Sequence, residues 1–272
     1  MQDEMINKIM KEVMKRVGSA DSDSAEPSEK SKNNPSPPAT PEDAVQLTEF
    51  VGVGLGDTQG IVIANVDPII HEQMGIDKKY RSIGIIGGRV GAGPQLMAAD
   101  EGIKATNTEI VAVEMPRDCK GGAGHGNLII FGAEDVSDAR RAVEVTLEVL
   151  PKFFGDVYAN DQGHLELQYS ARASRCLNYA LDAPLGKAFG LILGAPAVIG
   201  VLMIDTAVKA ADVKVVGYAS PNKNTTHTNE VFIWVSGDSG AVRQAVIAGR
   251  EVGKKLLGAW GDKPESVTQP YI

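Results

Sequence analysis

The chain contains an internal repeat, and two copies of one small unit constrain its fold more than its length or composition does. The segment MAADEGIKATNTEIVAVE aligns with LMIDTAVKAADVKVVGYA, so that Lys104 matches Lys209 at an offset of 105 residues. The same offset places the segment NLIIFG, which starts at Asn127, on FIWVSG, which starts at Phe232. Because separate segments share one offset, the sequence predicts two similar domains in tandem.

Both copies have the same predicted order of elements. A strand pair and a short helix precede an apolar strand, a helix, two further strands and a long closing helix. Pro94 stands where the first turn of a helix accepts proline, and Leu165 and Leu167 alternate with polar neighbours as in a strand. This order is typical of an α/β (α+β) fold of the ferredoxin-like kind. The strands after the first pair are expected at 83–87, 109–115 and 127–131 in the first copy and at 189–193, 213–219 and 231–236 in the second.

The closing helix of each copy carries an apolar stripe at spacings of three and four residues, which predicts a face packed on the sheet. Asp135 and Ser239 are the expected N-terminal caps of these helices. The stripes consist of Val136, Ala139, Val143, Leu147 and Leu150 in the first copy and Val242, Ala245, Gly249, Val252 and Leu256 in the second.

The amino-terminal segment differs from both copies. Residues 1–17 predict an amphipathic helix, whereas residues 18–44 hold no large apolar side chain and predict a disordered linker. A helix at the end of a tether has little of its own chain to pack on, so docking onto another protein and packing on its own domain both stay open. The two domains are expected at 45–151 and 152–272. The apolar side of the helix consists of Met5, Ile6, Ile9, Met10, Val13, Met14 and Val17.

Composition excludes several classes of function. The net charge of −8 disfavours nucleic acid as a partner, and the apolar stretches are too short and too interrupted by glycine to cross a membrane. The first residues carry charges inside their apolar pattern, so a secretory signal is not expected and the protein is predicted to be cytoplasmic. Cys119 and Cys176 form no CxxC pair, so we expect two reduced thiols and no zinc site.

Two other functions are alternatives for a chain with this pattern, nucleotide binding and the sensing of small molecules. Nucleotide binding would use glycines before a helix, but no GxGxxG occurs, and the glycines concerned are Gly84, Gly87, Gly88, Gly91 and Gly93. The histidines His71, His125, His164 and His227 show no catalytic or metal-binding spacing. A ferredoxin-like sensor of small molecules is the second alternative, and the ability to form layers would separate it from a structural protein.

The segments IDTAVKAADVKVVGY and VFIWVSGDSGAVRQAVIAG resemble the bacterial microcompartment shell domain. From about Leu47 to the carboxyl end, the segments LTEFVG, KATNTE, GGAGHG and FGDVYAN resemble the tandem-domain shell proteins of propanediol-utilisation compartments and their relatives in ethanol- and choline-utilising ones. This resemblance implies circularly permuted domains and a homotrimer shaped like a hexagon, which tiles the facets of a protein organelle together with other shell proteins. It implies no enzyme activity, no cofactor and no metal.

The resemblance also implies roles for particular residues. Lys104 and Lys209 would contact neighbouring tiles at the tile edge, although a lysine on a helix is more often simply solvated. The amino-terminal helix would face the lumen and bind encapsulated enzymes.

Two polar loops, 116–126 and 221–229, would line or close a pore that passes small diols, alcohols or aldehydes, although glycine-rich loops are often only mobile surface. Three copies of Cys119 around an axis would be able to ligate an iron–sulfur cluster, but a free thiol is the stronger expectation. The pore residues are Pro116, Arg117, Asp118, Cys119, Lys120, Gly121, Gly122, His125, Asn222, Lys223, Asn224, Thr225, Thr226 and His227.

Overall fold

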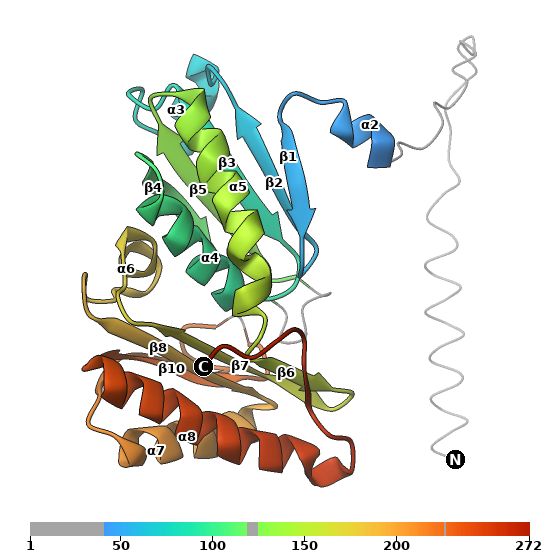
Figure 1. The fold of residues 1–272 in the computed structure, drawn as a ribbon, viewed down its shortest axis with the longest axis vertical. Helices are drawn as coiled ribbons and strands as arrows, with labels where there is room; N and C mark the ends of the chain where they lie inside the picture. The colour runs from blue at the N-terminus through green and yellow to red at the C-terminus, as the bar shows by residue number, and fades with distance from the viewer. Residues whose placement is uncertain (1–40, 119–124, 226) are drawn as a thin grey trace, which may run out of the picture. The chain divides into compact units, whose positions relative to one another are not determined.

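Two antiparallel sheets, one from each repeat, organise the chain (Figure 1). The structure is a computed structural model that describes residues 41–118, 125–225 and 227–272. The first sheet has the order β1-β2-β3-β5-β4 and the second the order β11-β6-β7-β8-β10-β9. The first sheet contains β1 (Phe50–Gly54), β2 (Thr58–Ile63), β3 (Ser82–Gly88), β4 (Glu109–Glu114) and β5 (Asn127–Ala133). The second contains β6 (Val157–Asn160), β7 (Gly163–Ser170), β8 (Ala188–Ala195), β9 (Lys214–Ala219), β10 (Val231–Gly237) and β11 (Glu265–Ser266).

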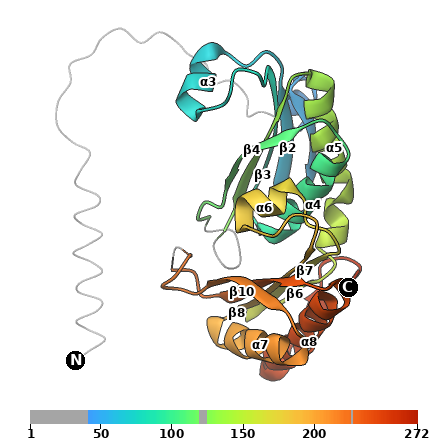
Figure 2. The same ribbon diagram turned by 90° about the vertical axis from the view of Figure 1, so that its left-hand side faces the viewer.

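The helices follow the same order in both repeats. In the first repeat α4 and α5 pack on one face of the first sheet, and in the second repeat α7 and α8 pack on one face of the second sheet (Figures 1 and 2). The short helices α3 and α6 occupy matching places between the second and third strands of each repeat. The helices are α2 (Pro41–Val45), α3 (Pro68–Met74), α4 (Gly93–Lys104), α5 (Val136–Phe153), α6 (Arg175–Leu181), α7 (Ala197–Ala210) and α8 (Ser239–Leu257), followed by a short 3-10 helix (Gly258–Trp260).

The predicted strands and helices of both repeats are confirmed, but three details of the closing helices differ from the prediction. The cap of α8 is Asp238, whose carboxylate accepts hydrogen bonds from the backbone N–H groups of Gly240 and Ala241; Ser239 is the first helical residue. Asp135 occupies the cap position of α5, yet its side chain makes no capping hydrogen bond. Val136, the first residue of α5, is exposed instead of buried.

The ends of the predicted domains shift slightly in the structure. Helix α2 begins at Pro41, inside the stretch 18–44 that the sequence assigns to the linker. The expected boundary between residues 151 and 152 falls within α5, which continues to Phe153. The predicted helix at residues 1–17 lies outside the described residues. Contacts join residues 40–272 into one unit that contains both repeats.

A shared hydrophobic core joins the two repeats. Leu96 and Met97 of α4 belong to the same cluster of buried side chains as Leu177 of α6 and Phe189 and Leu191 of β8. The face of the second sheet that α7 and α8 leave open is therefore covered by the first repeat of the same chain. Figure 2 shows α4 and α6 between the two sheets.

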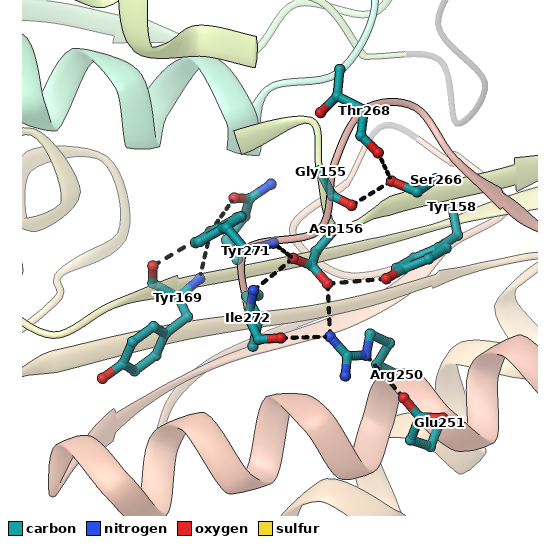
Figure 3. Close-up of polar contacts among 11 residues, drawn as sticks. Gly155, Asp156, Tyr158, Tyr169, Arg250, Glu251, Ser266, Thr268, Tyr271 and Ile272 are labelled. Atoms are coloured by element: carbon teal, nitrogen blue, oxygen red, sulfur yellow. Dashed lines mark hydrogen bonds and ion pairs between the residues drawn. The ribbon is translucent and has the colours of Figure 1, made fainter. Parts of the chain in front are cut away.

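The carboxyl-terminal segment is fastened to the second sheet by one buried carboxylate (Figure 3). Asp156 accepts hydrogen bonds from the backbone N–H groups of Tyr271 and Ile272, at 2.8 and 3.0 Å. The Arg250 guanidinium pairs with the same carboxylate at 2.8 Å. The Tyr271 ring packs edge-on against Phe153 at the end of α5, so this segment also contacts the first repeat.

Candidate functional site between the two repeats

A cavity of about 800 Å³ lies where the two repeats meet. Apolar side chains of the shared core, including Leu96, Met97 and Leu191, form one part of its wall. The remaining wall is polar and ionisable. It includes His125, Gln162, His164, Glu166 and Glu230.

Glu166 reaches this wall from the middle of β7. Its neighbours Leu165 and Leu167 point into the core formed with α7 and α8, so Glu166 points to the opposite face, which the first repeat covers. Its carboxylate accepts a hydrogen bond from the backbone N–H of Gly93 at the start of α4. A Cβ atom at Gly93 would overlap the carboxylate, so only glycine leaves room for this contact. Burial, aided by the charge of Glu230, raises the pKa of Glu166 to about 7.

Glu230 pairs with a histidine of the other repeat. The His125 Nε2 atom lies 2.8 Å from Glu230 Oε1, and the Thr228 hydroxyl donates to the same oxygen at 2.9 Å. The hydrogen bond with Glu230 raises the pKa of His125, which favours the imidazolium form and an ion pair. Burial lowers the pKa of His164, so that ring is favoured as the neutral form. The cavity wall therefore combines one ion pair, one neutral imidazole and one carboxyl that titrates near neutrality.

Several polar atoms of the wall have no hydrogen-bond partner among the described residues. They are His125 Nδ1, Gln162 Oε1 and Glu230 Oε2, and all three atoms are buried. Because unpaired buried polar groups cost free energy, these atoms favour an occupant that carries hydroxyl groups or water. The apolar part of the wall favours an occupant that also has a hydrocarbon part.

Three of the predicted pore residues line this cavity: His125, Asn224 and Thr225. The Asn224 amide donates to the Tyr218 carbonyl, and the Thr225 hydroxyl donates to the Ser220 carbonyl, so their loop is folded back on its own strand end. The other described pore residues lie elsewhere on the two loops: Pro116, Arg117, Asp118, Asn222, Lys223 and His227. Five predicted pore residues lie outside the described residues: Cys119, Lys120, Gly121, Gly122 and Thr226.

The predictions from sequence missed Glu166 and Glu230, the two acids of the cavity. One signal for Glu166 was present, because Leu165 and Leu167 mark an alternating strand and so place Glu166 on its second face. The sequence does not tell whether that face meets water or another domain. Glu230 stands next to the strand β10 and offered no signal of its own.

The two predicted edge lysines have different surroundings. Lys104 lies 3.0 Å from the buried carboxylate of Asp100, and its side chain is 29% exposed. Lys209 pairs with Asp205 at 2.7 Å, and its side chain is 72% exposed. The first lysine therefore lies near the junction of the repeats, and the second lies on open surface.

The structure gives a physical reason against nucleotide binding at the start of α4. The start of α4, where a nucleotide phosphate would bind, already holds the carboxylate of Glu166.

Within the described ranges, no group of three or more His, Cys, Asp or Glu side chains is placed to bind a metal ion. Cys176 is a free, buried thiol. Among the helices described, none has the length and apolar character needed to span a membrane.

Comparison with known proteins agrees with this architecture. The BMC domain family matches residues 188–260, which run from β8 through α8. The bacterial microcompartment shell protein PduB of Citrobacter freundii is 54% identical over 271 residues, which cover 99% of this chain and 98% of the relative. PduB of Salmonella typhimurium is 53% identical over 272 residues, with 99% and 98% coverage.

Solved structures show the same fold. A crystal structure described as a trimeric bacterial microcompartment shell protein PduB superposes with a TM-score of 0.80 at 52% identity, and covers 83% of this chain and 100% of its own. The structure of EtuB from Clostridium kluyveri gives a TM-score of 0.81 at 53% identity, with 83% and 99% coverage. The expected tandem shell-domain fold is confirmed. The chain belongs to the PduB family of bacterial microcompartment shell proteins, which is structural and not enzymatic.

Proposed function

We propose that this shell protein forms a tile of three chains and that the cavity between its repeats binds small neutral molecules with hydroxyl groups. The solved PduB relative is described as trimeric. Three chains with two similar repeats each place six similar domains around one axis. Each contact joins two unlike faces, and because the rotation closes after three chains, the contacts form a ring and not an open filament.

The buried, unpartnered polar atoms of the cavity carry the proposal about its ligand. A short diol or triol has several hydroxyl groups, each able to donate to Gln162 Oε1 or Glu230 Oε2 and to accept from a protonated ring nitrogen of His125. Its carbon chain would contact Leu96 and Leu191. The carboxylates of Glu166 and Glu230 disfavour anions, so carboxylates and phosphates fit less well than neutral diols or alcohols.

Calorimetric titration of the assembled protein with 1,2-propanediol and glycerol tests this role. We expect weak, saturable binding, and Gln162→Leu should weaken it about fivefold, because one hydrogen bond contributes about 1 kcal/mol. Gln244→Leu, on the exposed side of α8, is the matched control and should bind like the wild type. Absence of saturable binding by the wild type, or equal affinity in both variants, would contradict the proposal.

The two loops remain proposed pore loops at the axis of the tile. Their polar side chains and the cavity-lining Thr225 support a path for small molecules across the shell. Replacing Thr225 and Thr226 with leucine should slow metabolite flux through assembled compartments. Unchanged flux would count against a pore at these loops.

A further inference from the structure

The polar side chains of the cavity wall between the repeats are unequally divided between free donors and free acceptors. Several donors of the wall are already used, because they donate to backbone carbonyl groups. These donors are the amides of Asn160, Gln168 and Asn224 and the hydroxyl of Thr225. By contrast, Gln162 Oε1 and Glu230 Oε2 are buried acceptors without a partner among the described residues. The described wall therefore offers a ligand more acceptors than donors.

Glu166 is the group of the wall that can change this balance. Its carboxylate accepts a hydrogen bond from the backbone N–H of Gly93. When the carboxyl is protonated, its O–H is an additional donor that faces the cavity. When it is ionised, both of its oxygens can only accept. The protonation state of this one residue thus decides whether a ligand finds a donor at this part of the wall.

Leu191 lies next to the Glu166 carboxyl and gives a ligand its orientation. A Cβ atom at Gly93 would overlap the Glu166 carboxylate and lie 3.3 Å from Cδ2 of Leu191, so these two side chains are neighbours. Leu191 also belongs to the apolar core that both repeats share. A small molecule that packs its hydrocarbon part on Leu191 therefore places its polar atom near Glu166.

We propose that Glu166 selects the ligand class of the cavity: molecules with a hydroxyl group bind to both of its protonation states, whereas carbonyl compounds without a donor bind preferentially to the protonated state. This inference rests on the proposed binding of small neutral molecules and names the residue that selects among them. A hydroxyl group accepts from the protonated carboxyl or donates to the ionised one. A carbonyl oxygen only accepts, so it would cover the ionised carboxylate without pairing with it, which costs free energy.

The groups around Glu166 keep both protonation states accessible near neutral pH. Burial, which disfavours the charged form, and the charge of Glu230 together raise the pKa of Glu166 to about 7. The N–H of Gly93 and the charge of His125 oppose this rise. The other ionisable side chains that line the cavity or act on Glu166 are His164 on the same strand, Asp161 in the preceding turn and Tyr271 of the carboxyl-terminal segment.

The pair 2-propanol and acetone tests the selection, because these molecules have nearly the same shape and differ in hydroxyl against carbonyl. Ligand-observed NMR titrations of the full-length protein at pH 5.5 and pH 8 measure their affinities, with 1,2-propanediol as the reference ligand. With a pKa of about 7, about one tenth of Glu166 stays protonated at pH 8, so acetone should bind about tenfold more weakly there than at pH 5.5. The affinity for 2-propanol should change by less than about threefold.

The variant Glu166→Gln separates Glu166 from the other ionisable groups of the wall. Its amide does not titrate and keeps an N–H donor, so acetone should bind with the same affinity at both pH values. The matched control is Glu134→Gln, at an exposed position outside the cavity, which should keep the tenfold dependence of the wild type. A pH dependence that persists in Glu166→Gln would assign it to another group and overturn the proposal.

A second measurement uses the wild type alone and so does not depend on the folding of a variant. Because acetone favours the protonated carboxyl, its binding at pH 7 in a weakly buffered solution should take up about half a proton per chain at saturation. Binding of 2-propanol should take up almost none. A pH indicator dye measures the difference.

The results distinguish this inference from the proposed function. Acetone that binds equally at both pH values, binds at neither, or binds without taking up protons would overturn the role of Glu166, while binding of 1,2-propanediol would leave the proposed ligand role intact. If 1,2-propanediol binds at neither pH, the ligand role and the inference are refuted together.

Discussion

Glu166 shows how a single residue depends on the duplication. In a sheet exposed to water on one side, a glutamate between Leu165 and Leu167 would simply be solvated. Here the first repeat covers that side, and Glu166 is only 6% exposed. Its carboxylate lies at the start of α4. Its position next to Gly93 and in the wall of the cavity makes it a residue of the junction and not of the surface.

The stability of the chain should fall as the pH rises through neutrality, and Glu166 should cause part of that fall. Burial raises the pKa of Glu166 to about 7, above the 4.5 of an unperturbed glutamate. The stabilising contribution is thus complete below pH 4.5 and is lost as the pH passes about 7. Glutamine does not titrate, so the variant Glu166→Gln should not show this loss. Relative to the wild type, its free energy of unfolding should increase by about 2 kcal/mol between pH 5 and pH 8. Urea denaturation at several pH values measures it.

The control for this titration is Glu134→Gln, an exposed position outside the cavity, which should keep the pH profile of the wild type. A Glu166→Gln protein whose profile parallels the wild type would show that Glu166 does not titrate in this range.

Asp156 should be essential for stability, because it holds the carboxyl-terminal segment. Replacing it with alanine leaves the Arg250 guanidinium without its buried partner and frees the N–H groups of Tyr271 and Ile272. We expect a loss of about 3–5 kcal/mol in the free energy of unfolding, measured by urea denaturation. The matched control is Glu251→Ala, which removes the other, half-exposed partner of Arg250 and should cost less than about 1 kcal/mol. Equal losses in the two variants would contradict this account.

At the scale of elements, the repeat made most of the fold predictable. Strands such as β10 and helices such as α8 follow from alternation and from apolar stripes, which depend on local geometry. The caps were less predictable, because Asp238 and Ser239 are both good capping residues and only the backbone decides which one caps α8. The junction of the repeats was not predictable, because a pattern shows which residues share a face but not what covers that face.

The amino-terminal segment gives a prediction at the same scale. If residues 1–17 bind encapsulated enzymes, a chain without residues 1–44 should still assemble, because both sheets lie in the remaining part. It should release cargo, which co-purification of enzymes with intact compartments measures. Full retention of cargo by compartments that contain only the shortened chain would contradict this role.

At the scale of the whole molecule, the two lysines test how tiles meet. Lys104→Ala combined with Lys209→Ala should leave the mass of the trimer unchanged, and extended layers should become fewer or smaller in electron micrographs. The matched control is Lys187→Ala together with Lys263→Ala, two exposed lysines outside the repeated segment. If layers form as readily without Lys104 and Lys209 as with them, these lysines are not edge contacts.

The central claim is that two fused shell domains make this chain a building block of flat layers. The most direct measurement is electron microscopy of the purified full-length chain, alone and mixed with other shell proteins, combined with its mass in solution. The account predicts trimers that pack edge to edge into hexagonally ordered layers. A stable monomer that enters no layer under either condition would contradict it.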